Sequence, residues 1–149
     1  MEEKTKTAIG TDITLLGPEH VRRYRETDGE IGYLWNGATA LLMTTKGRKS
    51  GEERTIPIIF TKVDELYVVI ASKGGSPTHP AWYLNIQAEP HVHVQVKADK
   101  FDAIARTALP PERERLWAEA VKQWPAYDVY QSRTSRNIPV VVLERVSAA

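Results

Sequence analysis

Residues 55–71, TIPIIFTKVDELYVVIA, contain two strand-like segments separated by two acidic residues. Residues 55–63 and 66–71 are rich in β-branched and aromatic side chains, which strands favour. The Asp-Glu pair between them leaves room only for a tight turn. Together with an apolar, partly β-branched run at residues 39–45, this stretch predicts a meander of antiparallel strands.

The rest of the chain continues this pattern. Residues 91–98, HVHVQVKA, alternate strictly between apolar and polar, and residues 101–108 return after a turn. Residues 138–146, IPVVVLERV, are apolar enough for a strand buried on both faces. Short helices are predicted over residues 18–25, 81–88 and 111–124, with a helical or looped segment at 125–137.

The turns between strands are mostly tight, so the sheet should be antiparallel. About six strands with β-branched interiors would close best as a small barrel. The expected fold class is therefore mainly β with short helices (α+β). Length predicts a single domain over residues 1–149, with residues 1–16 flexible.

Composition narrows the classes of function. The net charge of +1 means that any anion site must come from local clustering of charge. The absence of cysteine excludes disulfides and thiolate metal sites. No segment approaches the roughly 18 apolar residues that cross a bilayer, and the polar N-terminus has no signal-peptide core. A cytoplasmic protein is the default, and the N-terminal segment is a candidate for peripheral contact with a membrane.

Residues 46–54, KGRKSGEER, form the most basic loop. Its glycines let successive N–H groups form an anion-binding concavity, and arginine offers paired donors to phosphate or carboxylate. Glu52 and Glu53 partly cancel this charge. On composition alone, a solvated hairpin end is favoured over an anion site by about two to one.

Two further segments could line a ligand site, although ordinary packing explains each of them as well. Residues 71–77, ASKGGSP, join a strand to a helix that Thr78 could cap. Trp82 and Tyr83 are adjacent on that helix, so one can face the core and the other a pocket. Asn85 could bond a ligand amide or cap locally.

Trp124, Tyr127 and Tyr130 recur every third residue and predict one aromatic stripe on a helix. Periodicity alone favours a core-facing stripe, but its polar surroundings, including Arg133 and Arg136, also suit the mouth of a ligand cleft. A tyrosine hydroxyl can donate a proton or a hydrogen bond where charge develops.

Other groupings are weaker. His91 and His93 share a strand face, but no third ligand is evident, so exposed histidines are favoured by roughly four to one and no metal site is predicted. Ser72 and Ser135 lack the G-x-S-x-G setting of a hydrolase nucleophile, and no carboxylate dyad is visible. The chemistry is therefore expected to come from a cofactor.

The segments TTKGRKSGEERTIPI, VVIASKGGSPTHPAWYLNIQAEPHVHVQV and YDVYQSRTSRNIPVVVLE lie within residues 41–146. In order and spacing they resemble the deazaflavin-dependent nitroreductases, F420-dependent oxidoreductases of actinobacteria that are also described as F420H2-dependent quinone reductases. The resemblance implies a split β-barrel related to flavin reductases. It also implies binding of coenzyme F420, a deazaflavin with a phosphate and a polyglutamate tail.

By this resemblance, cofactor contacts fall on matching positions. The phosphate and tail would be held by Arg48, Lys49, Ser50 and Arg54. Contacts beside the ring system would come from Thr55, Ile56, Pro57, Ile58, Ile59, Ile70, Ala71, Ser72, Lys73, Ala81, Trp82, Tyr83, Leu84 and Asn85. Ser72 or a nearby N–H would support the ring, Tyr127 would face ring and substrate, and Tyr130 would be its neighbour. Some members carry tyrosine where this chain has Trp124, which changes the substrate cleft.

The reaction that the resemblance implies is hydride transfer from C5 of reduced F420 to a quinone, enone or nitro compound. The protein would bind, orient and stabilise charge. Two alternatives stay open, a split barrel that binds FMN or haem and a non-catalytic F420 carrier. A barrel that binds nucleic acid through its basic loop is disfavoured by the low net charge.

Overall fold

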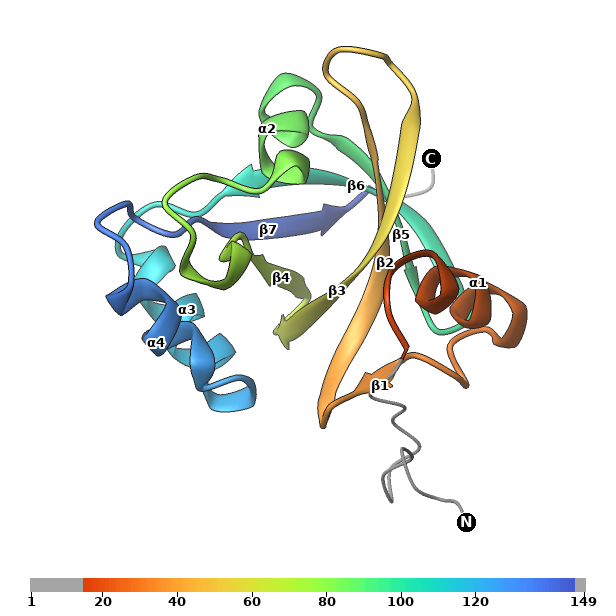
Figure 1. Ribbon diagram of the computed structural model, residues 1–149, viewed down its shortest axis with the longest axis horizontal. Coiled ribbons are helices and arrows are strands. Elements are labelled where there is room, and N and C mark those ends of the chain that lie inside the picture. The colour runs from red at the N-terminus through yellow and green to blue at the C-terminus, as the bar shows by residue number, and fades with distance from the viewer. Residues whose placement is uncertain (1–14, 147–149) are drawn as a thin grey trace.

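Six antiparallel strands close into a barrel in the computed structural model, which describes residues 15–146 (Figure 1). The hydrogen-bonded order is β2-β3-β4-β7-β6-β5, and pairing of β5 with β2 closes the ring. A two-residue strand, β1 (Leu34–Trp35), pairs with the first two residues of β2. The barrel strands are β2 (Ala38–Lys46), β3 (Glu53–Val63), β4 (Leu66–Ile70), β5 (His91–Val96), β6 (Asp99–Thr107) and β7 (Val140–Arg145). The predicted antiparallel barrel of about six strands is confirmed.

Two hairpins place β3 and β4, the strands predicted from residues 55–71, in the barrel. Val63 pairs with Leu66, so Asp64 and Glu65 form a two-residue turn, with Asp64 at a left-handed φ of 54°. The β2–β3 hairpin is longer and extends beyond the barrel in Figure 1, carrying the basic loop at its tip. The tip is closed by a hydrogen bond from Gly47 N to Glu52 O of 2.8 Å.

In the described range 15–146, four α-helices and one short 3₁₀ helix surround the barrel: α1 (Gly17–Thr27), η1 (Lys73–Gly75), α2 (Ala81–Ala88), α3 (Glu112–Gln123) and α4 (Ala126–Ser132). Two local predictions are wrong. Pro80, not Thr78, occupies the N-cap of α2, while the Thr78 hydroxyl lies 3.2 Å from Lys73 Nζ. The aromatic stripe is divided, because α3 ends at Gln123 with Trp124 as its C-cap, and a new helix starts after Pro125.

Two of the three hydrophobic clusters in residues 15–146 lie on either side of β7. Val141 and Leu143 point into the barrel, whereas Val140 and Val142 pack under α3 and α4. All four side chains are fully buried, so the prediction of a last strand buried on both faces is confirmed.

The expectation of a flexible N-terminus falls mostly on residues 1–14, which lie outside the described residues, as does the predicted membrane contact. Leu15 is buried, and its carbonyl accepts a bond of 2.9 Å from Trp35 Nε1. In residues 15–146 we find no helix that is long and apolar enough to cross a membrane.

Tyr24 attaches α1 to the barrel. Its buried hydroxyl donates to Ala40 O at 3.0 Å and accepts from Lys97 N at 2.9 Å, and burial raises its pKa to about 12. We expect Tyr24→Phe to lower the free energy of unfolding by about 1–3 kcal/mol, because the buried carbonyl of Ala40 and the N–H of Lys97 lose their partner. Urea denaturation measures this, with Tyr33→Phe as the matched control. Equal stability of the two variants would contradict this role of the hydroxyl.

Candidate functional site

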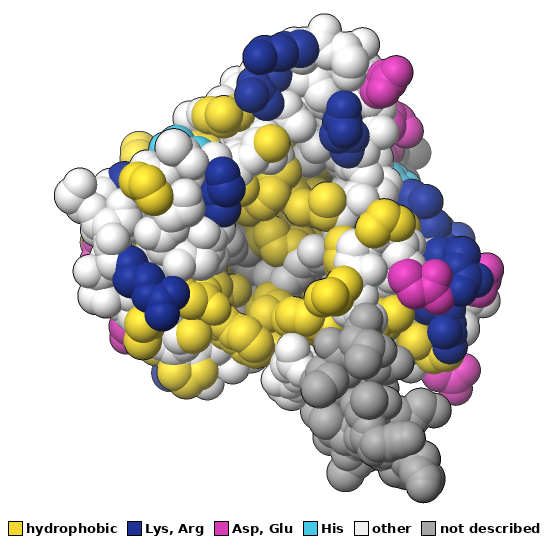
Figure 2. Space-filling view, viewed as in Figure 1, with side chains coloured by type: hydrophobic (Ala, Val, Ile, Leu, Met, Phe, Trp, Pro, Cys, Tyr) yellow, Lys and Arg dark blue, Asp and Glu magenta, His cyan; other side chains and the backbone are white. Residues whose placement is uncertain are grey.

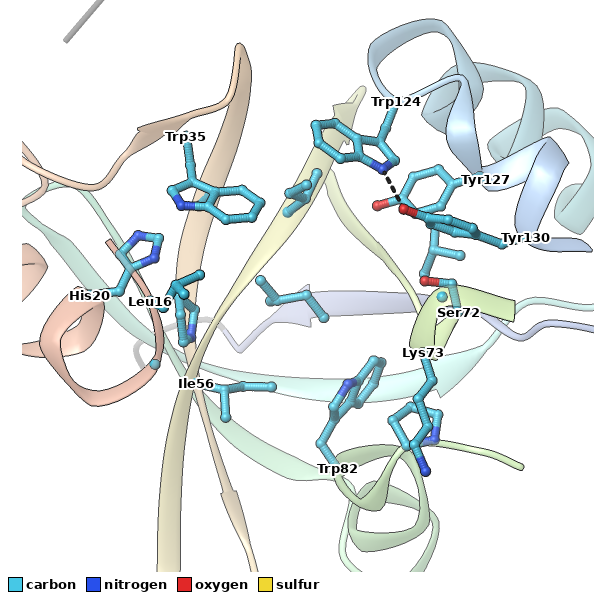
Figure 3. A pocket seen from close by; sticks show the side chains of 18 residues that line it. Leu16, His20, Trp35, Ile56, Ser72, Lys73, Trp82, Trp124, Tyr127 and Tyr130 are labelled. Carbon is cyan, nitrogen blue, oxygen red and sulfur yellow. Dashed lines mark hydrogen bonds between the residues drawn. The ribbon is translucent and has the colours of Figure 1, made fainter. Parts of the chain in front are cut away.

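An apolar cavity of about 560 Å³ opens beside the barrel. Figure 2 shows a hollow floored by hydrophobic side chains, with Lys and Arg side chains spaced around its rim. Figure 3 shows indole and phenol rings approaching it from opposite sides. A cavity of this size and character suits a planar, mostly apolar ligand.

Three of the predicted segments meet at this cavity. They are the first half of β3, the end of β4 with the loop around η1, and the aromatic residues of α4, and α2 contributes one indole. The predicted site residues that line the cavity are Ile56, Pro57, Ile58, Ile59, Ile70, Ser72, Lys73, Trp82, Tyr127 and Tyr130.

Six residues predicted beside the ring system lie outside it, and two of them, Ala81 and Asn85, line a second groove described below. The Thr55 hydroxyl bonds Thr44 Oγ1 at 2.7 Å and accepts from Arg25 at 2.9 Å. Ala71 is fully buried. Tyr83 packs in the barrel core, and Leu84 is half-buried on the same helix. Trp82 faces the cavity while Tyr83 faces the core, which confirms that these neighbours point in different directions.

Tyr127 is buried, yet its hydroxyl forms no hydrogen bond with any other residue of the described chain, 15–146. Figure 3 shows this hydroxyl directed into the cavity. Burial, and then the neighbouring Tyr130, raises the pKa of Tyr127 above its ordinary value. The side chain therefore stays protonated near neutral pH and can donate to a ligand.

Trp124 and Tyr130 complete this aromatic wall. Trp124 Nε1 lies 3.5 Å from the Tyr130 hydroxyl, the contact drawn in Figure 3. The rings of Tyr127 and Tyr130 meet edge to face at 6.1 Å between centroids. The predicted stripe thus lines one cavity wall, although it comes from two helices.

The opposite wall was not predicted from the sequence. Leu16, Gly17 and His20 come from the start of α1, and Trp35 comes from β1. The Trp35 ring stacks on Trp124 at 6.4 Å and closes one side of the cavity. Burial lowers the pKa of His20, whose Nε2 lies 2.9 Å from Gly32 O. Of these residues, only Trp35, an indole next to the polar Asn36-Gly37 turn, offered a sequence signal.

A second, smaller groove of about 240 Å³ lies at the basic loop. Its lining residues include the predicted set Arg48, Lys49, Ser50, Arg54, Ala81 and Asn85. Lys49 and Arg54 are exposed and form no ion pair with another residue in the range 15–146. Ala81 lines this groove and Trp82 lines the cavity, so the two hollows adjoin at the start of α2.

Asn85 holds the basic loop against α2. Its buried amide oxygen accepts from Arg48 N at 3.2 Å and from Arg48 Nη1 at 2.8 Å. Asn85 therefore neither caps its own helix nor points to solvent. It fixes one side of the groove, and the charged groups of Lys49 and Arg54 remain accessible to a ligand.

The two exposed histidines lie away from both hollows. His91 Nδ1 is 2.7 Å from Glu89, and His93 Nδ1 is 3.1 Å from Asp102. Within the described part of the chain, no three His, Cys, Asp or Glu side chains gather as a metal site.

Comparisons with known proteins agree with this geometry. Residues 17–145 match the F420H(2)-dependent quinone reductase family. The chain is 42% identical over 131 residues to an F420H(2)-dependent quinone reductase of Mycobacterium tuberculosis, covering 85% of this chain and 87% of the relative.

Solved structures show the same relationship. An F420-H2 dependent reductase is 42% identical, with a TM-score of 0.66, over 70% of this chain and 93% of that one. The heme storage protein HutZ of Vibrio cholerae is 12% identical, with a TM-score of 0.57, over 88% and 91% of the two chains. The second likeness shows the fold alone. Since the family match covers almost all of the described residues, the chain belongs to the F420H(2)-dependent quinone reductase family.

Proposed function

We propose that this protein transfers a hydride from reduced coenzyme F420 to a quinone, with the apolar cavity as the site of reaction. Family membership establishes an F420H2-dependent oxidoreductase. The observation that carries the placement is the junction of an apolar cavity with a cationic groove at the start of α2. A flat ring with an anionic tail needs two such hollows side by side.

The residues present fit this cofactor. The ring system would lie against Ile56, Ile58 and Trp82, whose apolar surfaces exclude water. The phosphate and the polyglutamate tail would be held by Lys49 and Arg54, whose charges face the groove. We therefore propose an anion-binding role for the basic loop, in place of the solvated hairpin end that composition alone favoured.

When bound, reduced F420 supplies the hydride, from C5 of its ring. The protein's part is to hold donor and acceptor in contact and to stabilise charge on the acceptor. Tyr127 would donate its hydroxyl proton, as a hydrogen bond or by transfer, to the acceptor oxygen as that oxygen becomes negative. Ser72, which lies beside Tyr127 and Tyr130 on the same cavity wall in Figure 3, would support the ring.

Enones and nitro compounds are further acceptors that the same chemistry would allow. Trp124 makes the cavity narrower than a tyrosine there would, and its stacking on Trp35 adds rigidity. We therefore propose flat quinones as better acceptors than substituted nitroimidazoles.

Titration with F420 and then with FMN tests the proposal. We expect micromolar F420 binding, weak or no FMN binding, and oxidation of F420H2 by menadione. A yellow protein that retains FMN, or a red one that retains haem, would support the FMN or haem alternative. Tight F420 binding without turnover on quinones, enones or nitro compounds would indicate a carrier. Steeply salt-dependent binding to generic DNA would point to nucleic acid instead.

A further inference from the structure

Arg136, in the loop between α4 and β7, donates to four acceptors of the loop that carries Ser72. Its Nε lies 2.7 Å from Ser76 O, and its Nη2 lies 2.8 Å from Ser72 O. Both terminal nitrogens are 3.3 Å from Ala71 O, and Nη1 is 3.0 Å from His79 Nδ1. Burial lowers the pKa of Arg136, which forms no ion pair within residues 15–146.

The loop needs this support because its own backbone holds it weakly. Lys73, Gly74 and Gly75 are all at positive φ, and for lysine this conformation is strained. The loop's internal backbone bonds are Gly75 N to Ser72 O and Ser76 N to Lys73 O. Arg136 supplies donors to the carbonyls of Ala71 and Ser76, and a second donor to that of Ser72.

The same loop touches α4 directly. A Cβ on Gly75 would lie 2.6 Å from Tyr130 O, and Arg133 Nη1 donates to Gly74 O at 3.3 Å. Gln131 on α4 donates to Arg136 O at 2.8 Å. The Ser72 loop, the Arg136 loop and α4 are therefore packed together, with Ser72 and Tyr127 on their shared cavity wall.

We propose that Arg136 is a positioning residue for the hydride-transfer site, because it fixes Ser72 relative to Tyr127, and that it does so fully only while His79 is neutral. Only the predicted effect of Arg136 on turnover rests on the proposed function. The predicted effect of Arg136 on the conformation of the Ser72 loop does not depend on any cofactor or reaction.

The pH dependence follows from the contact between the two side chains. His79 Nδ1 faces Arg136 Nη1, so it must accept, and the imidazole proton sits on Nε2. The groups that face His79 are Arg136 and the Tyr83 ring at 4.9 Å, with Lys73 bonded to the adjacent Thr78. None of them is a carboxylate. Burial, and then the charge of Arg136, lowers the pKa of His79. Protonation at low pH would remove the acceptor and place two cations in contact.

Amide hydrogen exchange without cofactor tests the structural half. We expect Arg136→Gln to speed exchange in residues 72–79 at least about tenfold, with Arg136→Lys intermediate. Arg115→Gln is the control, since Arg115 is exposed on α3, with a single long contact to Asp64 of 3.8 Å. Unchanged exchange in a folded Arg136→Gln variant would overturn the inference. If that variant does not fold, the comparison of Arg136→Lys with wild type decides.

Kinetics test the functional half. We expect Arg136→Gln to lower kcat about tenfold while the F420 Kd stays nearly unchanged, since the basic groove is untouched. Wild-type kcat should fall on the acid side below about pH 6.5. His79→Asn keeps an acceptor that does not titrate and should remove this limb, whereas His93→Asn should keep it. A limb that persists in His79→Asn would refute the pH dependence. Failure of wild type to oxidise F420H2 would instead overturn the proposed function and leave the exchange result standing.

Discussion

Replacing Tyr127 with phenylalanine should lower kcat about 100-fold, the usual loss when one preorganised donor to a developing oxyanion is removed. The hydroxyl is directed into the cavity and is bonded to no other residue in the range 15–146, so its donor capacity is available to a ligand. The ring remains, and with it the packing against Trp117 and Tyr130. We therefore expect the F420 Kd and the thermal stability to change little.

Stopped-flow oxidation of F420H2 by menadione and by cyclohexenone measures this loss. Tyr67→Phe is the matched control and should keep wild-type turnover, because Tyr67 packs against the barrel core and does not line the cavity. Because burial raises the pKa of Tyr127, wild-type kcat should be level on the alkaline side up to about pH 10, the ordinary tyrosine value. Unchanged turnover of Tyr127→Phe on several acceptors would exclude the proposed role.

The double substitution Lys49→Ala/Arg54→Ala should raise the F420 Kd roughly 30-fold and leave kcat unchanged. Each exposed cation facing an anionic tail contributes on the order of 1 kcal/mol, and 1.4 kcal/mol is tenfold in Kd. Both side chains line the basic groove and neither lines the cavity, so the hydride-transfer geometry should be preserved. The difference from wild type should shrink as salt is raised, because exposed charges are screened.

Fluorescence titration with F420 at low and high salt checks this prediction. Lys122→Ala/Arg115→Ala removes the same two residue types from α3 and should bind as wild type does. A deazaflavin that lacks the phosphate and glutamates should bind the wild type and the Lys49→Ala/Arg54→Ala variant equally weakly. If the double variant still prefers F420 over that truncated compound as strongly as wild type does, the tail is held elsewhere.

Much of the fold was predictable because its elements depend on local patterns. The Val63–Leu66 turn needs only a pair of turn-forming residues between two β-rich runs, and β5 needs only strict alternation. The break between the helix at residues 111–124 and the segment after it was predicted, but the spacing of Trp124, Tyr127 and Tyr130 was taken as one stripe on a single helix, and this was wrong. Pro125 caps the start of a new helix, α4, and both helices pack with β7 in one hydrophobic cluster.

The candidate site divides in the same way. The family resemblance predicted Thr55, Tyr83 and Leu84 as cofactor contacts along with the neighbours that do line the cavity, because a sequence motif includes every residue in a run. Strand alternation and the turn of a helix then direct adjacent side chains to opposite sides, which places Thr55 against Arg25 and Tyr83 in the core.

By itself, the sequence of this protein determined the antiparallel barrel, the basic hairpin tip and the loops that supply polar groups, because each arises from neighbours along the chain. Only the tertiary structure decided which of these meet. The docking of α1 brings Leu16 and His20 across from Tyr127, and Trp35 closes the wall against Trp124. Arg136 reaches the carbonyl of Ser72 across more than sixty intervening residues. Contacts of this range depend on how helices and loops that are distant in the sequence dock on the closed barrel, which no local pattern specifies.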